Sequence, residues 1–167
     1  MRSDNRGHPS TPRGEGLLVT LRTILLGSKR VGPRRGTLIA IGLGLFGVTF
    51  LAYEIDVFYN SGGVVFVPFH AAIVGVIAAF WVGYSRNGLL VGWIFAYLSL
   101  LGWHAEWATN ISARPLIERV YYVVRPDGLL ALAIIGMVVA FGGFTAGALL
   151  QKGINALRAE RRSDTNP

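Results

Sequence analysis

The stretch from Gly128 to Leu150 reads GLLALAIIGMVVAFGGFTAGALL and contains no ionisable side chain. At about 1.5 Å per residue, a helix of this length exceeds the hydrocarbon thickness of a bilayer, which is about 30 Å. A helix of a water-soluble bundle carries polar residues along one face with a period of about 3.6, and this stretch has no such face. The sequence therefore predicts a transmembrane helix at 128–150.

Three further apolar segments precede this one and approach the length needed to cross a bilayer. They are residues 37–57, 64–84 and 88–108. Only 15% of the chain is charged, against roughly 25% in soluble domains, so there is too little charge to cover the surface of a soluble fold. We therefore predict an all-α membrane protein in which residues 37–150 form a four-transmembrane-helix bundle.

The segments on either side of this bundle are polar and basic. Residues 1–15 are rich in Ser, Pro, Gly and charge, which predicts a disordered tail. In 16–36, apolar residues recur at helical spacing and predict a short interfacial amphipathic helix followed by a basic linker. These apolar residues are Leu17, Leu18, Leu21, Ile24 and Leu25. Residues 151–167 are expected to form a basic tail that first continues the fourth helix.

The connection over 104–127 is the longest one between the predicted spans. After Pro115, apolar residues again follow helical spacing, and proline is favoured in the first turn of a helix. These residues are Ile117, Val120, Tyr121 and Val124. We expect a short helix on the outer face that caps the bundle, with recognition of a partner as the other role considered. A short strand over 120–124 is the structural alternative.

The distribution of Lys and Arg predicts the orientation. The N-terminal segment, the turn at 85–87 and the C-terminal tail hold most of them, whereas residues 54–63 hold none. Because cytoplasmic flanks carry the excess of positive charge, both termini are expected in the cytoplasm and the protein in the cell membrane.

The basic linker is expected to lie among anionic lipid headgroups. Its cations are Lys29, Arg30, Arg34 and Arg35. Nucleic acid is the alternative partner of such a basic segment. We do not expect it, because the adjoining apolar chain brings lipid nearer.

Small residues spaced by four run along each predicted span and are expected to let helix backbones pack closely, as they do in lipid. The positions are Gly36, Ala40 and Gly44 in the first span, Ala71, Gly75, Ala79 and Gly83 in the second, Gly88, Gly92 and Ala96 in the third, and Gly143 and Gly147 in the fourth. The pattern leaves open whether these contacts form within one chain, in a homo-oligomer or in a larger membrane complex.

Enzyme motifs do not account for this sequence. Gly42-Leu-Gly-Leu-Phe-Gly47 matches the dinucleotide-binding pattern, but it lies inside a predicted span and lacks the preceding strand and the acidic residue about 20 positions later. The chain has no cysteine, which excludes a thiolate metal site and a cysteine nucleophile. We therefore expect neither an enzyme nor a bound cofactor.

The remaining ionisable groups gather at the expected outer end of the bundle. A hairpin closed at 85–87 places His70 at the same depth as His104, with Glu54 and Glu106 as nearby carboxylates. Two histidines and a carboxylate could bind a metal ion or relay protons. We expect instead that these groups approach one another without completing a metal site and keep the outer rim hydrated.

The sequence thus predicts a small multi-pass membrane protein of unknown biochemical activity. A structural or accessory subunit that acts through helix–helix contacts is the favoured interpretation. The alternative is a small transporter or a redox or metal-binding membrane protein that uses His70 and His104.

Overall fold

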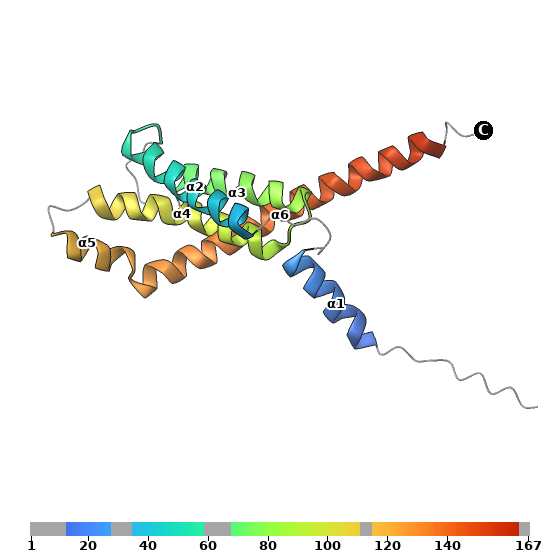
Figure 1. The fold of residues 1–167 in the computed structure, drawn as a ribbon, viewed down its shortest axis with the longest axis horizontal. Helices are drawn as coiled ribbons and strands as arrows, with labels where there is room; N and C mark the ends of the chain where they lie inside the picture. Colours follow the sequence, from blue (N-terminus) through green and yellow to red (C-terminus); the bar gives the residue numbers. More distant parts are fainter. Residues whose placement is uncertain (1–12, 28–34, 59–67, 111–114, 164–167) are drawn as a thin grey trace, which may run out of the picture.

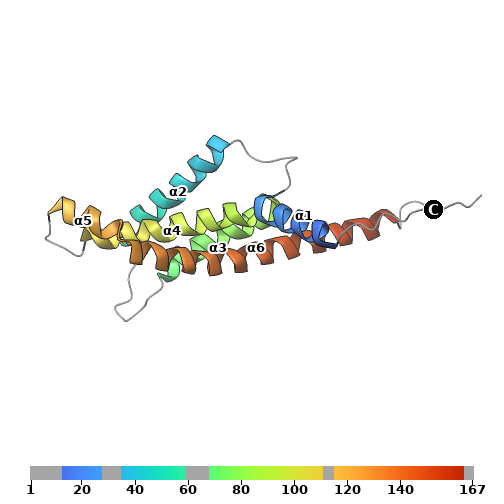
Figure 2. The ribbon, with the colours of Figure 1, turned by 90° about the horizontal axis from the view of Figure 1, so that it is seen from below.

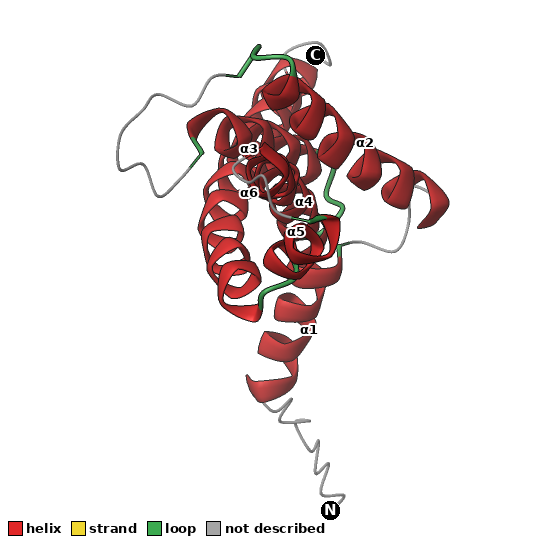
Figure 3. Ribbon diagram, turned by 90° about the vertical axis from the view of Figure 1, so that its left-hand side faces the viewer, coloured by secondary structure: helices red, strands yellow, loops and turns green. Residues whose placement is uncertain are grey.

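A computed structural model of the chain describes residues 13–27, 35–58, 68–110 and 115–163, and all regular structure in these ranges is α-helical (Figures 1 and 3). The helices are α1 Arg13–Leu26, α2 Arg35–Glu54, α3 Phe69–Tyr84, α4 Leu89–Asn110, α5 Leu116–Val123 and α6 Pro126–Ser163. The prediction of an all-α protein is confirmed for these residues. The alternative of a strand over 120–124 is wrong, because α5 covers most of that range.

Three of these helices are long and apolar enough to cross a membrane. The stretches concerned are Gly36–Glu54 of α2, Leu89–Asn110 of α4 and Pro126–Ala159 of α6. The apolar helix α3 has only 16 residues, which correspond to about 24 Å of helix. It begins directly after Pro68, and residues 64–67 of the predicted second span lie outside the described residues. The structure therefore contains three candidate membrane-spanning helices.

The two outermost helices differ in how far they extend. The described part of the chain starts with α1 at Arg13, so this helix begins within the segment 1–15 that was expected to be disordered. At the other end, α6 has 38 residues and runs without a break to Ser163. Its C-terminal part extends beyond the other helices of the bundle (Figure 1).

The centre of the bundle is the contact of α3 with α4 and α6. The alanines at this contact, Ala71, Ala79, Ala96 and Ala140, are fully buried. A Cβ atom added at Gly75 would lie 3.1 Å from Cα of Ala96, and one added at Gly92 would lie 3.5 Å from Cα of Ala79. The small residues thus allow α3 and α4 to pack backbone against backbone.

The contact between α3 and α6 is closer still. A Cβ atom at Gly143 would lie 2.6 Å from the carbonyl oxygen of Val76. Cβ atoms at Gly83 and Gly147 would overlap with the carbonyl oxygens of Phe144 and Phe80. Hence the small residues of α3 and α6 pack within one chain.

Gly88 does not pack two helices together as the spacing suggested. It precedes α4 with φ +92°, and Gly27 follows α1 with φ +76°, both in the left-handed region that glycine tolerates. A Cβ atom at Gly88 would lie 2.6 Å from the backbone nitrogen of Gly27. The two glycines therefore hold the end of α1 against the turn between α3 and α4.

The α2 helix contacts α4 with one face and diverges from the bundle toward its own N-terminus (Figure 2). On the contacting face, a Cβ atom at Gly42 would lie 2.7 Å from Cδ1 of Leu98. By contrast, no atom lies within 4 Å of a Cβ atom added at Gly36 or Gly44. The contact expected at Gly44 is therefore not made by the described part of the chain, because α2 turns this face away from α4.

The α5 helix exposes its apolar face. Leu116, Ile117 and Tyr121 are 76%, 80% and 72% exposed. The helix contacts the C-terminal part of α4, where Tyr122 packs against His104 and Trp107. An apolar surface of this kind at one end of a membrane bundle fits a helix that lies along the lipid interface.

Candidate functional site

A chain of buried hydroxyl groups joins α2, α4 and α3 within the apolar bundle. The hydroxyl groups of Thr49 and Ser99 lie 3.2 Å apart, and Ser99 Oγ donates to the carbonyl oxygen of Ala71 at 2.9 Å. Both hydroxyl residues are fully buried. Since lipid offers no hydrogen-bonding partners, polar groups in membrane helices are satisfied by neighbouring helices. These two bonds therefore fix the relative positions of the three helices.

Tyr53 extends this polar chain toward the end of α2. Its hydroxyl oxygen accepts a hydrogen bond from the backbone N–H of Ala71 at 3.4 Å. Ala71 lies in the first turn of α3, where backbone N–H groups have no partner within the helix. Tyr53 thus caps α3 from another helix and is itself 3% exposed.

Two carboxyl groups, from Glu106 on α4 and Glu54 on α2, come together at the same end. Asn110 Nδ2 donates to Glu106 Oε1 at 2.6 Å and to Glu54 Oε2 at 3.4 Å. The spacing of four residues puts the side chains of Glu106 and Asn110 on one face of α4. Glu106 is only 5% exposed, and its Oε2 atom has no hydrogen-bond partner among the described residues.

His104 lies two residues before Glu106 on α4 and faces α5. Its ring centroid is 6.4 Å from that of Trp107 and 5.9 Å from that of Tyr122, and both rings are nearly parallel to it. The side chain is 8% exposed, and Nε2 has no hydrogen-bond partner in the described part of the protein. His104 and Glu106 are therefore two buried polar groups with unused hydrogen-bonding capacity.

His70 has different neighbours. Its ring stacks on Phe58 at a centroid distance of 5.1 Å and meets the edge of Tyr53 at 6.4 Å. Across residues 13–27, 35–58, 68–110 and 115–163, no group of three or more His, Asp or Glu side chains is arranged to hold a metal ion. The structure thus does not assemble His70, His104, Glu54 and Glu106 into a shared metal site.

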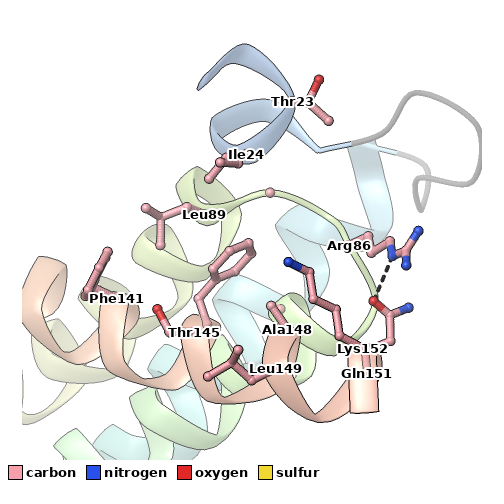
Figure 4. Close-up of a pocket in the computed structure, with 13 residues that line it drawn as sticks. Thr23, Ile24, Arg86, Leu89, Phe141, Thr145, Ala148, Leu149, Gln151 and Lys152 are labelled. Atoms are coloured by element: carbon pink, nitrogen blue, oxygen red, sulfur yellow. Dashed lines mark hydrogen bonds between the residues drawn. The ribbon is translucent and has the colours of Figure 1, made fainter. Parts of the chain in front are cut away.

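The opposite end of the bundle contains a cavity of about 700 Å³ (Figure 4). It lies between α1, the turn that follows α3, and α6. Most of its wall is apolar apart from Thr145, and the other polar side chains are at its rim. The rim residues are Thr23, Arg86, Gln151 and Lys152, and the larger apolar residues are Ile24, Leu89, Phe141, Phe144 and Leu149.

Arg86 is held at the rim by a local hydrogen bond. Its Nε atom donates to Oε1 of Gln151 at 2.7 Å, which links the α3–α4 turn to α6. Arg86 adopts φ +56°, a left-handed conformation that is uncommon for residues other than glycine. Figure 4 shows the Lys152 side chain reaching from α6 over Ala148, with the Arg86–Gln151 pair beside it.

The sequence indicated only part of these sites. Thr49 and Ser99 were missed, although a lone hydroxyl in an apolar span is the signal of an inward-facing position. The sequence indicated Arg86 and Lys152 only as part of the Lys and Arg distribution that predicts the orientation, and not as residues of a cavity. Of the four cations expected at lipid headgroups, Lys29, Arg30 and Arg34 lie outside the described residues, and Arg35 is the first residue of α2.

The described part of the chain is all-helical, and three of its helices are long and apolar enough to cross a membrane, which suggests a membrane protein. No protein-family model, curated protein or solved structure matches the chain.

Proposed function

We propose that this protein is a small multi-pass protein of the cell membrane that works as a structural or accessory subunit, without enzymatic activity. In this proposal the chain crosses the bilayer four times, with α2, α3, α4 and α6, and both termini are in the cytoplasm. The interface with other subunits, a second copy of this chain among them, is the exposed small-residue face of α2.

The separation of charge along the bundle supports the orientation. Most described cations lie at the end that carries the α3–α4 turn and the extension of α6, among them Arg22, Arg86, Lys152, Arg158 and Arg161, whereas Arg119 and Arg125 lie at the other end. Most described carboxylates lie at that other end, namely Glu54, Asp56, Glu106, Glu118 and Asp127, whereas Glu15 belongs to α1 and Glu160 to the extension of α6. By the positive-inside rule, the first of these ends is cytoplasmic.

The position of α3 supports the fourth crossing. This helix packs against both α4 and α6, which are long and apolar enough to cross a membrane, and this contact favours a position at the same depth. Its length of about 24 Å is less than the roughly 30 Å of a typical hydrocarbon core. A short span is accommodated by local thinning of the bilayer at a modest cost.

The observation that supports an accessory role is the exposed small-residue face of α2. Gly36, Ala40 and Gly44 are exposed, and open space surrounds both glycines. The corresponding small residues of α3, α4 and α6 are already used within the chain. Because association of helices in lipid depends on close backbone packing, this face is where a further helix can approach.

The test is the mass of the protein particle in mild detergent, measured by light scattering. We expect the wild-type particle to exceed the 18.1 kDa of one chain. Gly44→Leu is expected to reduce it to one chain, because the added side chain keeps a partner helix away. Gly142→Leu is the matched control, since Gly142 of α6 also faces open space. A wild-type particle of one chain, or an unchanged Gly44→Leu particle, would contradict the proposal.

The alternative function is a small transporter or a redox or metal-binding protein, for which the sequence indicated His70 and His104. In the structure, the residues that favour it are His104 and Glu106. Both side chains are buried and retain a polar atom without a described partner. Ionisable residues inside membrane bundles commonly belong to ion or proton pathways. The free energies of unfolding of Asn110→Ala, Glu106→Leu and the double variant distinguish a structural role of Glu106 from this alternative.

A further inference from the structure

The cavity beside α6 combines an apolar interior with a cationic rim. Its apolar side is formed by Phe141, Phe144 and Leu149 of α6, with Leu89 of α4 and Ile24 of α1 nearby. Its volume of about 700 Å³ is within the range of roughly 300–1,000 Å³ that is typical of pockets for small ligands. An amphiphilic molecule matches this combination of surfaces better than a fully polar or a fully apolar one.

The charge at the rim is positive and uncompensated. The side chains that line the cavity include Arg86 and Lys152 but no carboxylate. Neither cation belongs to an ion pair among the described residues; the ion pair found there joins Arg125 and Asp127 at the opposite end. Because Gln151 occupies only Nε of Arg86, the terminal guanidinium nitrogens can still donate to a ligand. The rim is therefore suited to an anion, and a phosphate group matches the fork of an arginine.

The position along α6 indicates where this ligand comes from. The sequence passes from apolar to polar at Leu150–Lys152, so the cavity extends from the hydrocarbon layer to the level of the headgroups. The α1 helix contributes Thr23 and Ile24 to the wall and is anchored nearby by the contact of Gly27 with Gly88. An amphiphile in the adjoining leaflet can enter without leaving the membrane.

We propose that this cavity binds one anionic phospholipid of the leaflet in which it lies. The phosphate group lies between the guanidinium group of Arg86 and the ammonium group of Lys152. One acyl chain follows the apolar wall formed by Phe141, Phe144 and Leu149, and the second remains in the bilayer. This site is separate from the association face of α2, and it does not depend on the subunit role proposed above.

Native mass spectrometry of the delipidated full-length protein in detergent tests this proposal. The probes are dioleoyl phosphatidylglycerol, dioleoyl phosphatidylcholine with the same acyl chains, and inorganic phosphate. We expect a single phosphatidylglycerol to bind at least about tenfold more tightly than phosphatidylcholine, because only the first has a net negative headgroup. Inorganic phosphate in excess is expected not to displace it, since phosphate cannot use the apolar wall.

Matched variants locate the site. Arg86→Ala combined with Lys152→Ala is expected to weaken phosphatidylglycerol binding by about tenfold or more, because each charge-assisted contact contributes on that scale. Arg22→Ala combined with Arg158→Ala removes the same charge outside the cavity lining and is expected to leave binding unchanged. Thr145→Phe fills the cavity without changing charge and is expected to abolish the single bound lipid.

The outcomes that overturn the proposal are equally specific. Equal affinities for the two phospholipids would show that Arg86 and Lys152 do not recognise the anionic headgroup. Displacement of phosphatidylglycerol by inorganic phosphate would indicate a site for a free anion. An equal loss in both double variants would indicate unspecific attraction to a basic protein. Helical circular dichroism of each variant identifies any loss of fold, and Lys152→Gln, on the exposed side of α6, then provides a milder test with a smaller expected loss.

Discussion

Gly147→Leu is expected to lower the free energy of unfolding by about 3 kcal/mol, at the upper end of the usual range for overpacking. A side chain at this position would collide with the carbonyl oxygen of Phe80, which belongs to the backbone of α3 and cannot rotate away. The two helices must therefore separate along their whole contact. Unfolding by a denaturing detergent, followed by circular dichroism, measures the change.

Gly142→Leu provides the control on the same helix. The two residues are five positions apart on α6, and the substitution is identical, but nothing lies within 4 Å of a Cβ atom at Gly142. We expect its free energy of unfolding to stay within about 0.5 kcal/mol of the wild type. Equal effects of the two substitutions would show that α3 and α6 do not pack as described.

Asn110→Ala is expected to destabilise the protein by about 1–3 kcal/mol, the usual cost of leaving a buried polar group without its hydrogen-bond partner. Its amide group donates the 2.6 Å hydrogen bond to Oε1 of Glu106. Without this donor, both oxygens of a carboxyl group that is only 5% exposed lack a partner among the described residues. Asn155→Ala, at an exposed position of α6, is the control and is expected to be near neutral.

A double-mutant cycle with Glu106→Leu shows whether this loss comes from the carboxyl group. In the Glu106→Leu background, Asn110→Ala is expected to cost little, because no buried carboxyl group remains to be satisfied. This result would assign Glu106 a structural role at the junction of α4 and α2. If Glu106→Leu alone were more stable than the wild type, the carboxyl group would be present at a cost to stability, which favours the alternative of an ion or proton pathway.

The sequence allowed the helices to be predicted because their signal is local. Runs without charge, such as 128–150, have few structural solutions in a bilayer, since only intrahelical hydrogen bonds satisfy the backbone there. The short length of α3 was less predictable. Pro68 fits at the start of a helix, and the sequence did not indicate that the helix would begin after it rather than at Val64.

The contacts between helices could be predicted only in part. Gly44 and Gly75 have the same spacing to other small residues, yet only Gly75 lies against another helix. The spacing of small residues identifies the face of a helix on which a neighbouring helix can approach closely. The crossing angle of the two helices decides whether the neighbour does approach there. The divergence of α2 from α4 is a tertiary property that the local pattern does not contain (Figure 2).

The candidate sites show the same limit. Hairpin geometry sets the depth of His70 and His104 but not the direction in which each side chain points. In the structure His70 stacks on Phe58, whereas His104 stacks on Tyr122 of α5. The proximity of Glu106 and Asn110 follows from a spacing of four on one helix, but the approach of Glu54 depends on how α2 crosses α4.

The most direct test of the central claim, four crossings with both termini in the cytoplasm, uses the absence of native cysteine. Single cysteines replace Val57 and Leu157, which are 62% and 63% exposed, and the exposed, charged Glu118 of α5. A fourth replaces Ser28 in the linker before α2. Intact cells are treated with a membrane-impermeant thiol reagent, and lysed cells serve as the positive control.

We predict labelling of Val57→Cys and Glu118→Cys in intact cells and of Ser28→Cys and Leu157→Cys only after lysis. Val57 and Glu118 are separated by α3 and α4. Because α4 is long and apolar enough to cross, the two positions lie on the same side only if α3 crosses as well. Labelling of Val57→Cys with protection of Glu118→Cys would mean that α3 does not cross. Labelling of Ser28→Cys in intact cells would contradict the orientation.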